Sequence, residues 1–374
     1  MEKKRQPRRI GIADVARRAG VSHATVSRVM NGSFTVDRTI ASRVRAAAEE
    51  LQYHPNPLGR SLALGKSETI GVLVPDLANP MFQAVLRGVS MAAAQDGYRV
   101  LIADSSETPS EEHILASDAR RRGDGVVLCA PRMSDEELED LAPGLQPLVL
   151  INRTSSGGTP TVSVDYADGI RNLAEHLYAL GHRRLAFLSG PENSASNRLR
   201  LQGLEQFLTE RPDASLQILP GGVSFASGHA AALEVLATSA TGVLAFNDLV
   251  AMGLLSGLHE QGVTVPGDLS VTGFDDIEFS GYTSPPLTTA TVPLNQLGEQ
   301  AWRRLHALLN PKADAGPGAD ADPATDIADI AEASGAEGSA VPENTVFATQ
   351  VQVRGSTGPA PADVRTSQRN PVTR

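Results

Sequence analysis

The sequence lacks the features that mark secreted and membrane proteins. Its 374 residues include a single cysteine, so no disulfide can form within the chain and a reducing compartment is expected. Its uninterrupted apolar runs are all shorter than the roughly 18 residues that suggest a membrane span. The basic start MEKKRQPRRIG is not followed by an apolar segment and does not resemble a secretory signal. We therefore expect a cytoplasmic protein that does not contact the membrane.

Motifs of catalysis and cofactor binding are also missing from the sequence. It contains no GxxxxGK(S/T) phosphate loop, no GxGxxG after a strand and no GxSxG, and His259-Glu260 is not followed by a second histidine at the HExxH spacing. The single cysteine, Cys129, lies in an apolar run, so we interpret it as a buried strand residue and not as a nucleophile. We expect neither an enzyme nor a bound metal or cofactor.

The net charge of −10 conceals a division of charge along the chain. Residues 1–66 contain thirteen Lys and Arg against five Asp and Glu, a balance of +8, whereas the remainder has 20 basic against 38 acidic residues, a balance of −18. A basic segment joined to an acidic body indicates that only the first part binds a polyanion such as nucleic acid. A solubilising basic tail is the alternative, but residues 11–53 have a helical patterning that a disordered tail lacks.

Three short helices are predicted in this basic segment. The first covers about Ile12–Ala19, and Gly20 can end it in the left-handed conformation. Ser22 is placed to cap a second helix over about His23–Met30. Asp37 can cap a third helix, which extends to residue 52 or 53 with apolar residues at helical spacing.

From residue 68 onward, apolar strand-like runs alternate with amphipathic helices. This alternation predicts an α/β fold with doubly wound parallel sheets, and the number of units favours two lobes. The predicted strands are Ile70–Pro75, Arg99–Ala103, Gly125–Cys129, Leu148–Asn152, Leu185–Ser189, Val243–Phe246, Leu269–Phe274 and Thr345–Val353. The predicted helices are Pro80–Gln95, Glu111–Arg122, Ala167–Leu180, Asn197–Leu208, Gly228–Ala237 and Leu249–Gln261.

A segment of different composition interrupts this pattern near the end of the chain. Residues 311–343 are rich in Ala, Gly, Pro and Asp, with eight acidic residues against the single Lys312. We interpret them as a disordered acidic insertion. Residues 359–374 are polar, contain proline and lack leucine heptads, so a flexible tail is expected there.

The segment Ile12–Asn31, IADVARRAGVSHATVSRVMN, has the layout of a helix-turn-helix. Ala16 allows two helices to cross closely, Gly20 forms the turn, and Val26 and Val29 anchor the second helix, which leaves its other face for a groove. This block resembles the LacI family of bacterial repressors, which share DVAxxAGVSxxTVSRVxN. The resemblance continues in LQYHPN, IGVLVPDLANP, NDLVAMG, VTGFDD, SPPLTT and RGST, and it covers nearly all of the chain except residues 1–8, 311–343 and the tail.

The resemblance implies three parts of the chain. Residues 1–56 are expected to form an all-α helix-turn-helix headpiece, and residues 57–66 a hinge helix that is too short to be stable alone. Residues 67–358 are expected to form a body like the periplasmic sugar-binding proteins, with two doubly wound lobes and a cleft between them. The first lobe then comprises about 67–165 and 293–310, and the second about 166–290 and 345–357.

The resemblance also implies which residues of the headpiece contact DNA. His23, Ala24 and Arg28 occupy base-reading positions, and Arg28 is the strongest candidate because a guanidinium matches O6 and N7 of guanine. Arg28 could instead contact a phosphate, and His23 could merely cover the helix start. Small polar residues at the helix ends are suited to phosphates that fix the register: Ser22, Thr25 and Asn31. For Ser22, helix capping is the other interpretation, and the two are compatible.

In the family that the chain resembles, the short helix after the prolines folds only on DNA. Leu62 is then the residue that enters the minor groove, together with its counterpart from a second protomer, and kinks the site. Arg60 is expected to meet a phosphate. A simple linker role is the alternative for Leu62, and Ala63 departs from relatives that have Lys or Arg at this position.

Ligand contacts of the body are expected where its parallel strands end. Residues that follow strands or match ligand-binding positions of the family are Asp76, Asn79, Met81, Phe82, Asn152, Arg153, Arg198, Asn247 and Asp275. Phe82 matches an aromatic that stacks on ligands, and Arg198 an arginine that clamps hydroxyls or carboxylates, whereas Asp248 is expected to cap a helix. Because Met81 and Val223 stand where many relatives have aromatic residues, a nucleobase remains an alternative to the favoured sugar or polyol.

These features predict a homodimeric repressor that reads a pseudo-palindromic operator and responds to a small ligand. We favour an inducer over a co-repressor, although the sequence does not reveal the sign of the coupling. One alternative is a transport-type sugar-binding protein, against which the headpiece argues. The other is an architectural DNA protein with a vestigial pocket, which calorimetry over a panel of sugars would distinguish from a sensor.

Overall fold

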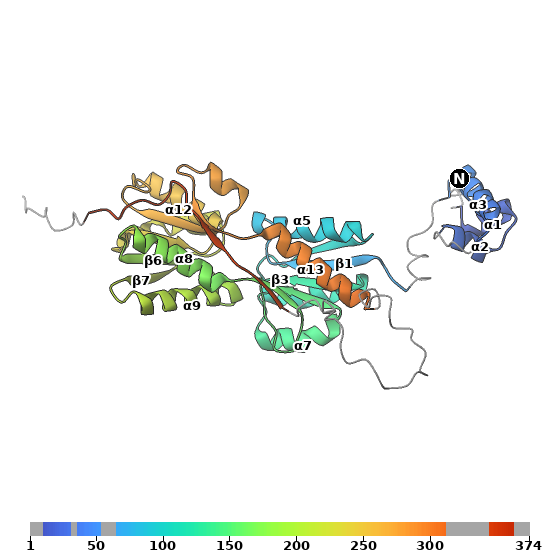
Figure 1. The fold of residues 1–374 in the computed structure, drawn as a ribbon, viewed down its shortest axis with the longest axis horizontal. Helices are drawn as coiled ribbons and strands as arrows, with labels where there is room; N and C mark the ends of the chain where they lie inside the picture. The colour runs from blue at the N-terminus through green and yellow to red at the C-terminus, as the bar shows by residue number, and fades with distance from the viewer. Residues whose placement is uncertain (1–9, 31–35, 54–64, 312–343, 363–374) are drawn as a thin grey trace, which may run out of the picture. The chain divides into compact units, whose positions relative to one another are not determined.

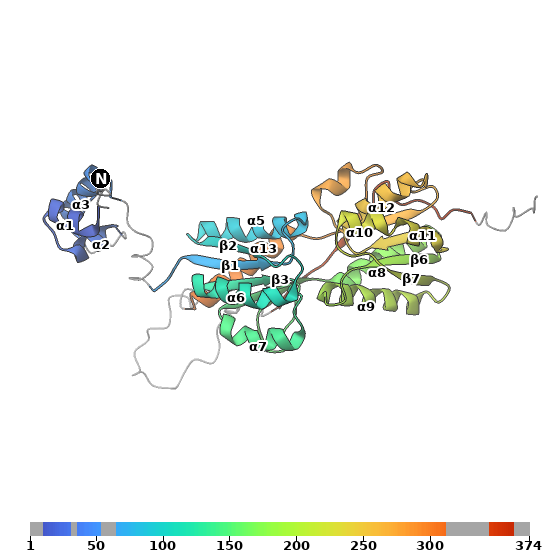
Figure 2. The same ribbon diagram turned by 180° about the vertical axis from the view of Figure 1, so that it is seen from behind.

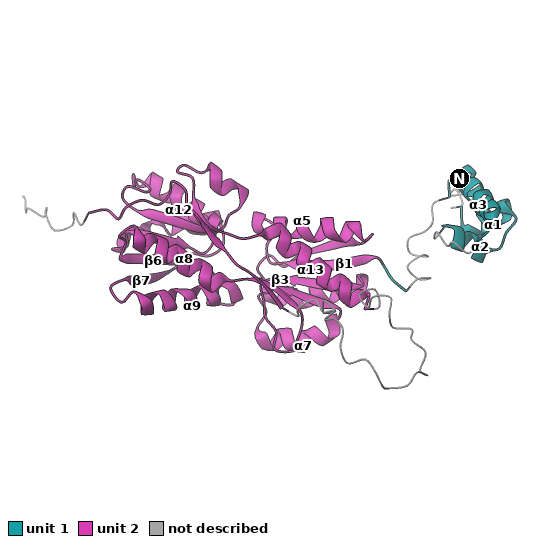
Figure 3. Ribbon diagram, viewed as in Figure 1, with its two compact units in different colours: residues 1–67 teal, residues 68–374 magenta. Residues whose placement is uncertain are grey.

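A computed structural model of the chain describes residues 10–30, 36–53, 65–311 and 344–362 (Figure 1). Contacts divide the chain into two compact units, residues 1–67 and 68–374 (Figure 3). Several predictions fall outside the described residues: the hinge helix over 57–64, the insertion over 312–343, and the DNA contacts of Asn31, Arg60 and Leu62.

The first unit contains three short helices, α1 (Ile12–Ala19), α2 (His23–Met30) and α3 (Arg38–Glu50). Small aliphatic side chains allow the helices to pack closely, and those of the core are Val15, Ala16, Ala19, Val26, Val29, Val44, Ala47 and Ala48. The predicted helices are therefore confirmed, except that α3 ends before residue 52.

Local signals determine where these helices begin and end. Gly20 ends α1 with φ of +65°, a conformation in which a Cβ would be strained. The carboxylate of Asp37 accepts hydrogen bonds from the backbone N–H groups of Thr39 and Ile40 at 2.9 and 3.3 Å, and thus caps α3. Both predictions from the sequence are confirmed.

The first lobe of the second unit is built on a six-stranded parallel sheet with the order β11-β5-β4-β3-β1-β2. Its strands are β1 (Thr69–Val74), β2 (Arg99–Asp104), β3 (Gly125–Cys129), β4 (Leu148–Ile151), β5 (Thr161–Val164) and β11 (Asn344–Phe347). Its helices are α5 (Pro80–Gln95), α6 (Pro109–Arg122), α7 (Asp135–Leu145) and α13 (Leu294–Leu309). Cys129 is buried in β3, as predicted.

Apolar side chains on both faces of these strands explain why helices cover both sides of the sheet. Val72 and Val127 pack in the same cluster as residues of α5 and α13, whereas Leu73 and Leu128 pack with residues of α6 and α7. Figure 2 shows α6 and α7 on one side of β1 and β3, with α5 and α13 on the other.

The helices α5 and α13 approach closely because each has a glycine at the contact. A Cβ on Gly88 would lie 2.1 Å from the carbonyl oxygen of Asn295, and a Cβ on Gly298 would lie 2.1 Å from that of Val85. A larger residue at either position would push the helices apart. This contact places α13 in the first lobe, although the strand before it belongs to the second.

The second lobe has a six-stranded sheet with the order β12-β10-β9-β8-β6-β7, parallel except for the antiparallel edge strand β12. Its strands are β6 (Arg184–Ser189), β7 (Ser215–Pro220), β8 (Gly242–Ala245), β9 (Ser270–Asp275), β10 (Thr288–Thr291) and β12 (Gln350–Gln352). Its helices are α8 (Tyr166–Ala179), α9 (Ala195–Glu210), α10 (Phe225–Ala230), α11 (Ala232–Ala237), α12 (Asp248–Glu260) and the 3-10 helix η1 (Glu278–Tyr282). The predicted fold class, two doubly wound lobes behind a helical headpiece, is confirmed.

The described chain passes between the lobes after β5, after β10 and after β11 (Figure 1). The last crossing corrects a prediction, because the single strand expected over Thr345–Val353 in the second lobe is two strands. β11 pairs with β5 in the first sheet, and β12 pairs with β10 in the second. Residues 344–347 therefore belong to the first lobe, since the pairing partner and not the local pattern decides which sheet a strand joins.

Two further predictions need correction. The helix expected over Gly228–Ala237 is divided at Ala231 into α10 and α11. The tail expected to be flexible from residue 359 is held at its start, because the backbone N–H of Ala360 donates to the carbonyl oxygen of Leu180 at 2.9 Å. Within the described ranges, no helix is long and apolar enough to cross a membrane.

Candidate functional site

The exposed face of α2 is the candidate DNA-binding surface of the first unit. Val26 and Val29 are buried in the core, whereas His23, Ala24 and Arg28 are exposed on the other side of the helix. An eight-residue helix with one face anchored and the other open has the form that a recognition helix requires.

The hydroxyl groups at the start of α2 are held in one arrangement. The backbone N–H of Thr25 donates to Oγ of Ser22 at 3.1 Å, which confirms Ser22 as the helix cap. The hydroxyl oxygens of Ser22 and Thr25 lie 2.9 Å apart. Ser22 is exposed and Thr25 is half-buried, so both lie at the surface of the unit.

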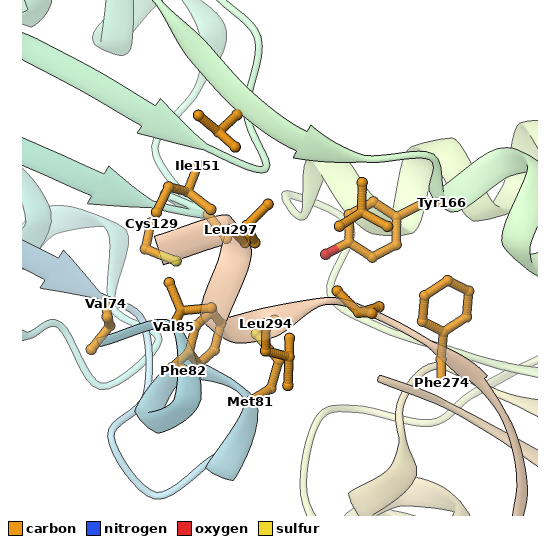
Figure 4. Packing of buried hydrophobic residues seen from close by; sticks show 14 of the residues in the cluster. Val74, Met81, Phe82, Val85, Cys129, Ile151, Tyr166, Phe274, Leu294 and Leu297 are labelled. Carbon is orange, nitrogen blue, oxygen red and sulfur yellow. The ribbon is translucent and has the colours of Figure 1, made fainter. Parts of the chain in front are cut away.

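The second unit contains a cavity between its two lobes, where strand ends of both sheets meet. The cavity is narrow: about 20 Å³ of it can take the centre of a water molecule, and the space between its atoms, open solvent included, is about 370 Å³. The first lobe contributes Asn79, Met81, Phe82, Glu107, Ala130 and Arg132 to the lining, and the second contributes Tyr166, Ser196, Arg200, Val223, Phe246, Asn247 and Asp275. Figure 4 shows part of the hydrophobic packing at this point, with Met81 and Phe82 of the first lobe on one side and Tyr166 and Phe274 of the second on the other; of these four, Phe274 is not among the lining residues.

A charged pair on the second-lobe wall of the cavity has unused hydrogen-bonding groups. Nη2 of Arg200 lies 4.0 Å from Oδ1 of Asp275, and both side chains are buried. Among the residues that the structure describes, Nε of Arg200 and Oδ1 of Asp275 have no hydrogen-bond partner. Burial raises the pKa of Asp275 well above its usual range, although the nearby guanidinium opposes this shift. Buried polar atoms without a hydrogen-bond partner destabilise the fold, and a ligand that supplies the missing hydrogen bonds removes this cost.

Aromatic rings hold the guanidinium of Arg200 in place. Its Cζ lies 4.4, 4.5 and 4.1 Å from the ring centres of Tyr166, Phe246 and Phe274. Its Nη1 donates to the carbonyl oxygen of Ser196 at 3.1 Å. The rings fix the plane of the guanidinium, so its remaining N–H groups have fixed directions.

A second charged pair lies on the first-lobe wall. Nε and Nη2 of Arg132 donate to the two carboxylate oxygens of Glu107 at 2.6 and 2.9 Å. The buried carboxylate of Glu112 accepts the backbone N–H groups of Arg132 and Met133 at 2.8 Å each. Burial raises the pKa of Glu112, while these two hydrogen bonds oppose the shift.

Arg153 and Arg198 lie beside the cavity and not in its lining. The buried guanidinium of Arg153 donates to the carbonyl oxygens of Pro131 and Met133 and to Oδ1 of Asp135, the last at 2.6 Å. Arg198 is half-exposed, and its Nη2 lies 3.6 Å from the same Asp135 oxygen. Arg153 therefore holds the loop that contains Arg132. Arg198 connects the second lobe to the first through its contact with Asp135.

Of the predicted ligand residues, five line the cavity and four do not. Asn79 and Asn247 are in the lining, but their side-chain oxygens also cap α5 and α12 by accepting from Met81 and Val250. The others in the lining are Met81, Phe82 and Asp275. Outside the lining are Arg153, Arg198, Asp76 and Asn152; Asp76 accepts from the backbone of Ala78, and Asn152 from that of Val164.

The prediction that Asp248 caps the following helix is wrong. Asn247 is the cap, and the buried carboxylate of Asp248 turns inward, where it accepts from the backbone of Ile277 and from the hydroxyls of Ser280 and Thr289. Three donors from separate elements converge on it, which only the tertiary fold could bring together.

Several lining residues are not predicted from the sequence, of which Arg200 is the most informative. The buried face of α9 contains Ser196, Arg200, Gly203, Leu204 and Phe207, which recur at helical spacing. Arg198 falls off this face. Applying the 3.6-residue period to α9 would have identified Arg200, whereas Glu107, Ala130 and Arg132 come from loops without a comparable signal.

Comparison with known proteins agrees with both units. Residues 11–56 match the model of bacterial regulatory proteins of the lacI family, and residues 174–325 match that of a periplasmic binding protein-like domain. The chain is 33% identical to the transcriptional repressor CytR of Escherichia coli K12 over 310 residues, which cover 80% of this chain and 90% of that protein.

Two solved structures extend the similarity to three dimensions. The Lac repressor dimer bound to operator and the anti-inducer ONPF has a TM-score of 0.78 at 28% identity, covering 93% of this chain and 99% of that one. A LacI-family regulator of Enterococcus faecium with bound ribose has a TM-score of 0.63 at 28% identity, covering 78% and 99%.

Fold and sites together define a DNA-binding transcriptional regulator with a periplasmic-binding-protein-like body. The chain belongs to the LacI family of bacterial regulatory proteins.

Proposed function

We propose that the protein is a repressor that binds a pseudo-palindromic operator as a homodimer and is released by a sugar or polyol in the interlobe cavity. The observation that carries the proposal is the buried Arg200–Asp275 pair, which lines the cavity between the lobes and has groups without a partner among the described residues. The same chain also presents an exposed recognition helix.

The DNA contacts are proposed for the exposed face of α2. Arg28 reads a guanine through two hydrogen bonds, and Ala24 offers an apolar contact to a thymine methyl. Ser22 and Thr25 position the helix on phosphates, for which their surface hydroxyls are suited. His23, at the first turn, donates to a base. Asn31, Arg60 and Leu62 keep the roles that the family resemblance implies.

A hydroxyl-rich ligand suits the cavity because a hydroxyl can both donate and accept. Nε of Arg200 needs an acceptor and Oδ1 of Asp275 needs a partner, and vicinal hydroxyls supply both. The rings of Phe82, Tyr166 and Phe246 provide apolar walls for the faces of a sugar. Asn79 adds an amide to the lining.

Homodimerisation follows from the need to read two half-sites, and the similar Lac repressor is bound to its operator as a dimer. Because the cavity takes residues from both lobes, a bound ligand changes the free energy of one lobe arrangement relative to another. For an inducer, the ligand binds more tightly to the arrangement that disfavours DNA binding. The protein acts by binding and not by catalysis, and it works in the cytoplasm.

Binding-site selection followed by effector titration tests this function. The full chain should enrich a pseudo-palindromic sequence from random DNA, and a neutral monosaccharide should weaken binding to that sequence at least about tenfold. Enrichment of a DNA sequence without two-fold symmetry would contradict the proposal that the protein binds its operator as a dimer. Stronger DNA binding with the sugar would reverse the sign to co-repression, and no effect of any sugar would contradict the proposed effector class. Mapping the operator in the source genome would then identify the adjacent genes, whose products indicate the ligand.

A further inference from the structure

Hydrogen bonds to neighbouring groups hold the Glu107–Arg132 pair in place on the first-lobe wall of the cavity. The side chain of Arg132 is 4% exposed and that of Glu107 is 23% exposed, and both line the cavity. Nη1 of Arg132 donates to the carbonyl oxygen of Ala130 at 3.0 Å. The carboxylate of Glu112 accepts the backbone N–H of Arg132 and so anchors the backbone from which this side chain extends.

The backbone that carries both partners is strained. Glu107 and the preceding Ser106 have φ of +56° and +50°, and Ala130 has φ of +46°. Non-glycine residues adopt this left-handed region at a steric cost, and they persist where the surrounding structure requires a particular geometry. Strain on both loops at the cavity indicates that the position of this pair matters for the cavity.

The pair controls the charge that a ligand meets on this wall. A guanidinium alone binds a carboxylate or phosphate through two parallel hydrogen bonds. In this chain the carboxylate of Glu107 already occupies that edge of Arg132 through Nε and Nη2. An anionic ligand would have to displace Glu107 or lie beside its negative charge, whereas a neutral hydroxyl can accept from Arg132 and donate to Glu107.

We propose that Glu107 sets the charge selectivity of the cavity: by neutralising Arg132, it makes the first-lobe wall accept uncharged sugars and reject sugars with a carboxylate or phosphate. This inference rests on the proposed sugar-sensing function. It assigns Glu107 and Arg132 as specificity-determining residues, and Glu112 as a positioning residue that holds Arg132 through its backbone.

Calorimetry on the full chain tests the selectivity with matched probes. The probes are D-glucose, D-galactose and D-ribose, each compared with an acidic counterpart: D-glucuronate, D-galacturonate and D-ribose 5-phosphate. Wild type should bind no acid more tightly than its neutral counterpart. Glu107→Gln should bind at least one acid about tenfold more tightly than wild type does, because Arg132 then offers an unneutralised charge-assisted hydrogen bond. Added salt should reduce this gain.

Further variants separate selectivity from a purely structural role. Glu107→Ala should show the same gain as Glu107→Gln, and the double variant Glu107→Gln with Arg132→Gln should lose it, because the gain needs the guanidinium. Glu299→Gln is the matched control, since it removes an exposed carboxylate that pairs with Arg303 in the same lobe, and it should change no preference.

The proposal is overturned if folded Glu107 variants bind the acids no better than wild type, even if their melting temperatures fall. It is also overturned if wild type prefers an acid to its neutral counterpart, a measurement that needs no variant. If wild-type operator binding responds to no neutral sugar while Glu107→Gln gains an acid, charge selectivity is supported and the proposed effector class fails. The two ideas can therefore fail separately.

Discussion

Asp135 of α7 and Arg198 of α9 form an ion pair across the two lobes, with 3.6 Å between Oδ1 and Nη2. The same Asp135 oxygen receives Nη2 of the buried Arg153 at 2.6 Å, so the aspartate is fixed on the first lobe. Both helices begin beside residues of the cavity, Arg132 before α7 and Ser196 within α9. Closure of the lobes and binding in the cavity therefore involve the same elements.

Arg198→Gln should favour separation of the lobes and weaken ligand binding about two- to fivefold, because half-exposed ion pairs contribute at most about 1 kcal/mol. Single-molecule FRET between dyes on the two lobes should report a larger open fraction, and calorimetry the change in affinity. Arg303→Gln breaks an exposed pair within the first lobe and is the control. An unchanged open fraction in Arg198→Gln would contradict a role for this contact in closure.

Arg200→Lys should abolish the ligand response while operator binding stays within about twofold of wild type. Lysine keeps the charge but loses Nε and the planar group that packs between three rings. Arg198→Lys serves as the matched change two residues away and should retain the response. Titration of the operator complex with effector measures both. A normal ligand response in Arg200→Lys would show that Arg200 does not bind the ligand.

Arg28→Ala should relax the preference at one base pair in each half-site, at a cost of about 1–3 kcal/mol for the preferred base. Binding-site selection with sequencing measures this loss position by position. Arg45→Ala, on the exposed face of α3, should leave the selected sequence unchanged. If Arg28→Ala selects the same sequence as wild type and only binds more weakly, Arg28 contacts a phosphate.

Gly88→Ala should destabilise the first lobe by about 1–3 kcal/mol, because the added Cβ would lie 2.1 Å from the backbone of Asn295. Urea unfolding followed by circular dichroism measures the loss. Gly144→Ala is also a helical substitution, but outside its own stretch of helix no atom of the described residues lies within 4 Å of the added Cβ, so it should be neutral or stabilising. Equal stability of the two variants would show that α5 and α13 can separate without cost.

Asp248→Asn should alter how stability depends on pH. Burial raises the pKa of Asp248 from 3.8 to about 6, so the folded state holds this proton more tightly than the unfolded chain. The contribution of Asp248 to stability is then fully present below about pH 4 and is lost as the pH rises through 6. The free energy of unfolding of wild type relative to Asp248→Asn should fall by about 2 kcal/mol between pH 4 and 7. Parallel curves for the two proteins would contradict this.

The sequence alone determined the features that depend on neighbours along the chain. The helices of the first unit and the caps at Ser22 and Asp37 were predictable because capping and left-handed glycine act over three or four residues. Most strands and helices of the body were predictable. A strand that helices cover on both faces is buried on both sides, so it is recognised in the sequence as a continuous apolar run. The family motifs added the overall architecture.

The tertiary structure alone decided which side chains meet. The pattern around residue 345 predicted a strand, but only the pairing partners divided it between two sheets. Arg198 and Arg200 are equivalent in charge, yet the rotation of about 200° between two residues of α9 places Arg200 in the cavity and Arg198 at the lobe contact. The Glu107–Arg132 pair joins loops 25 residues apart. The Glu107–Arg132 contact depends on the packing of distant elements, for which the loops that carry it contain no local signal.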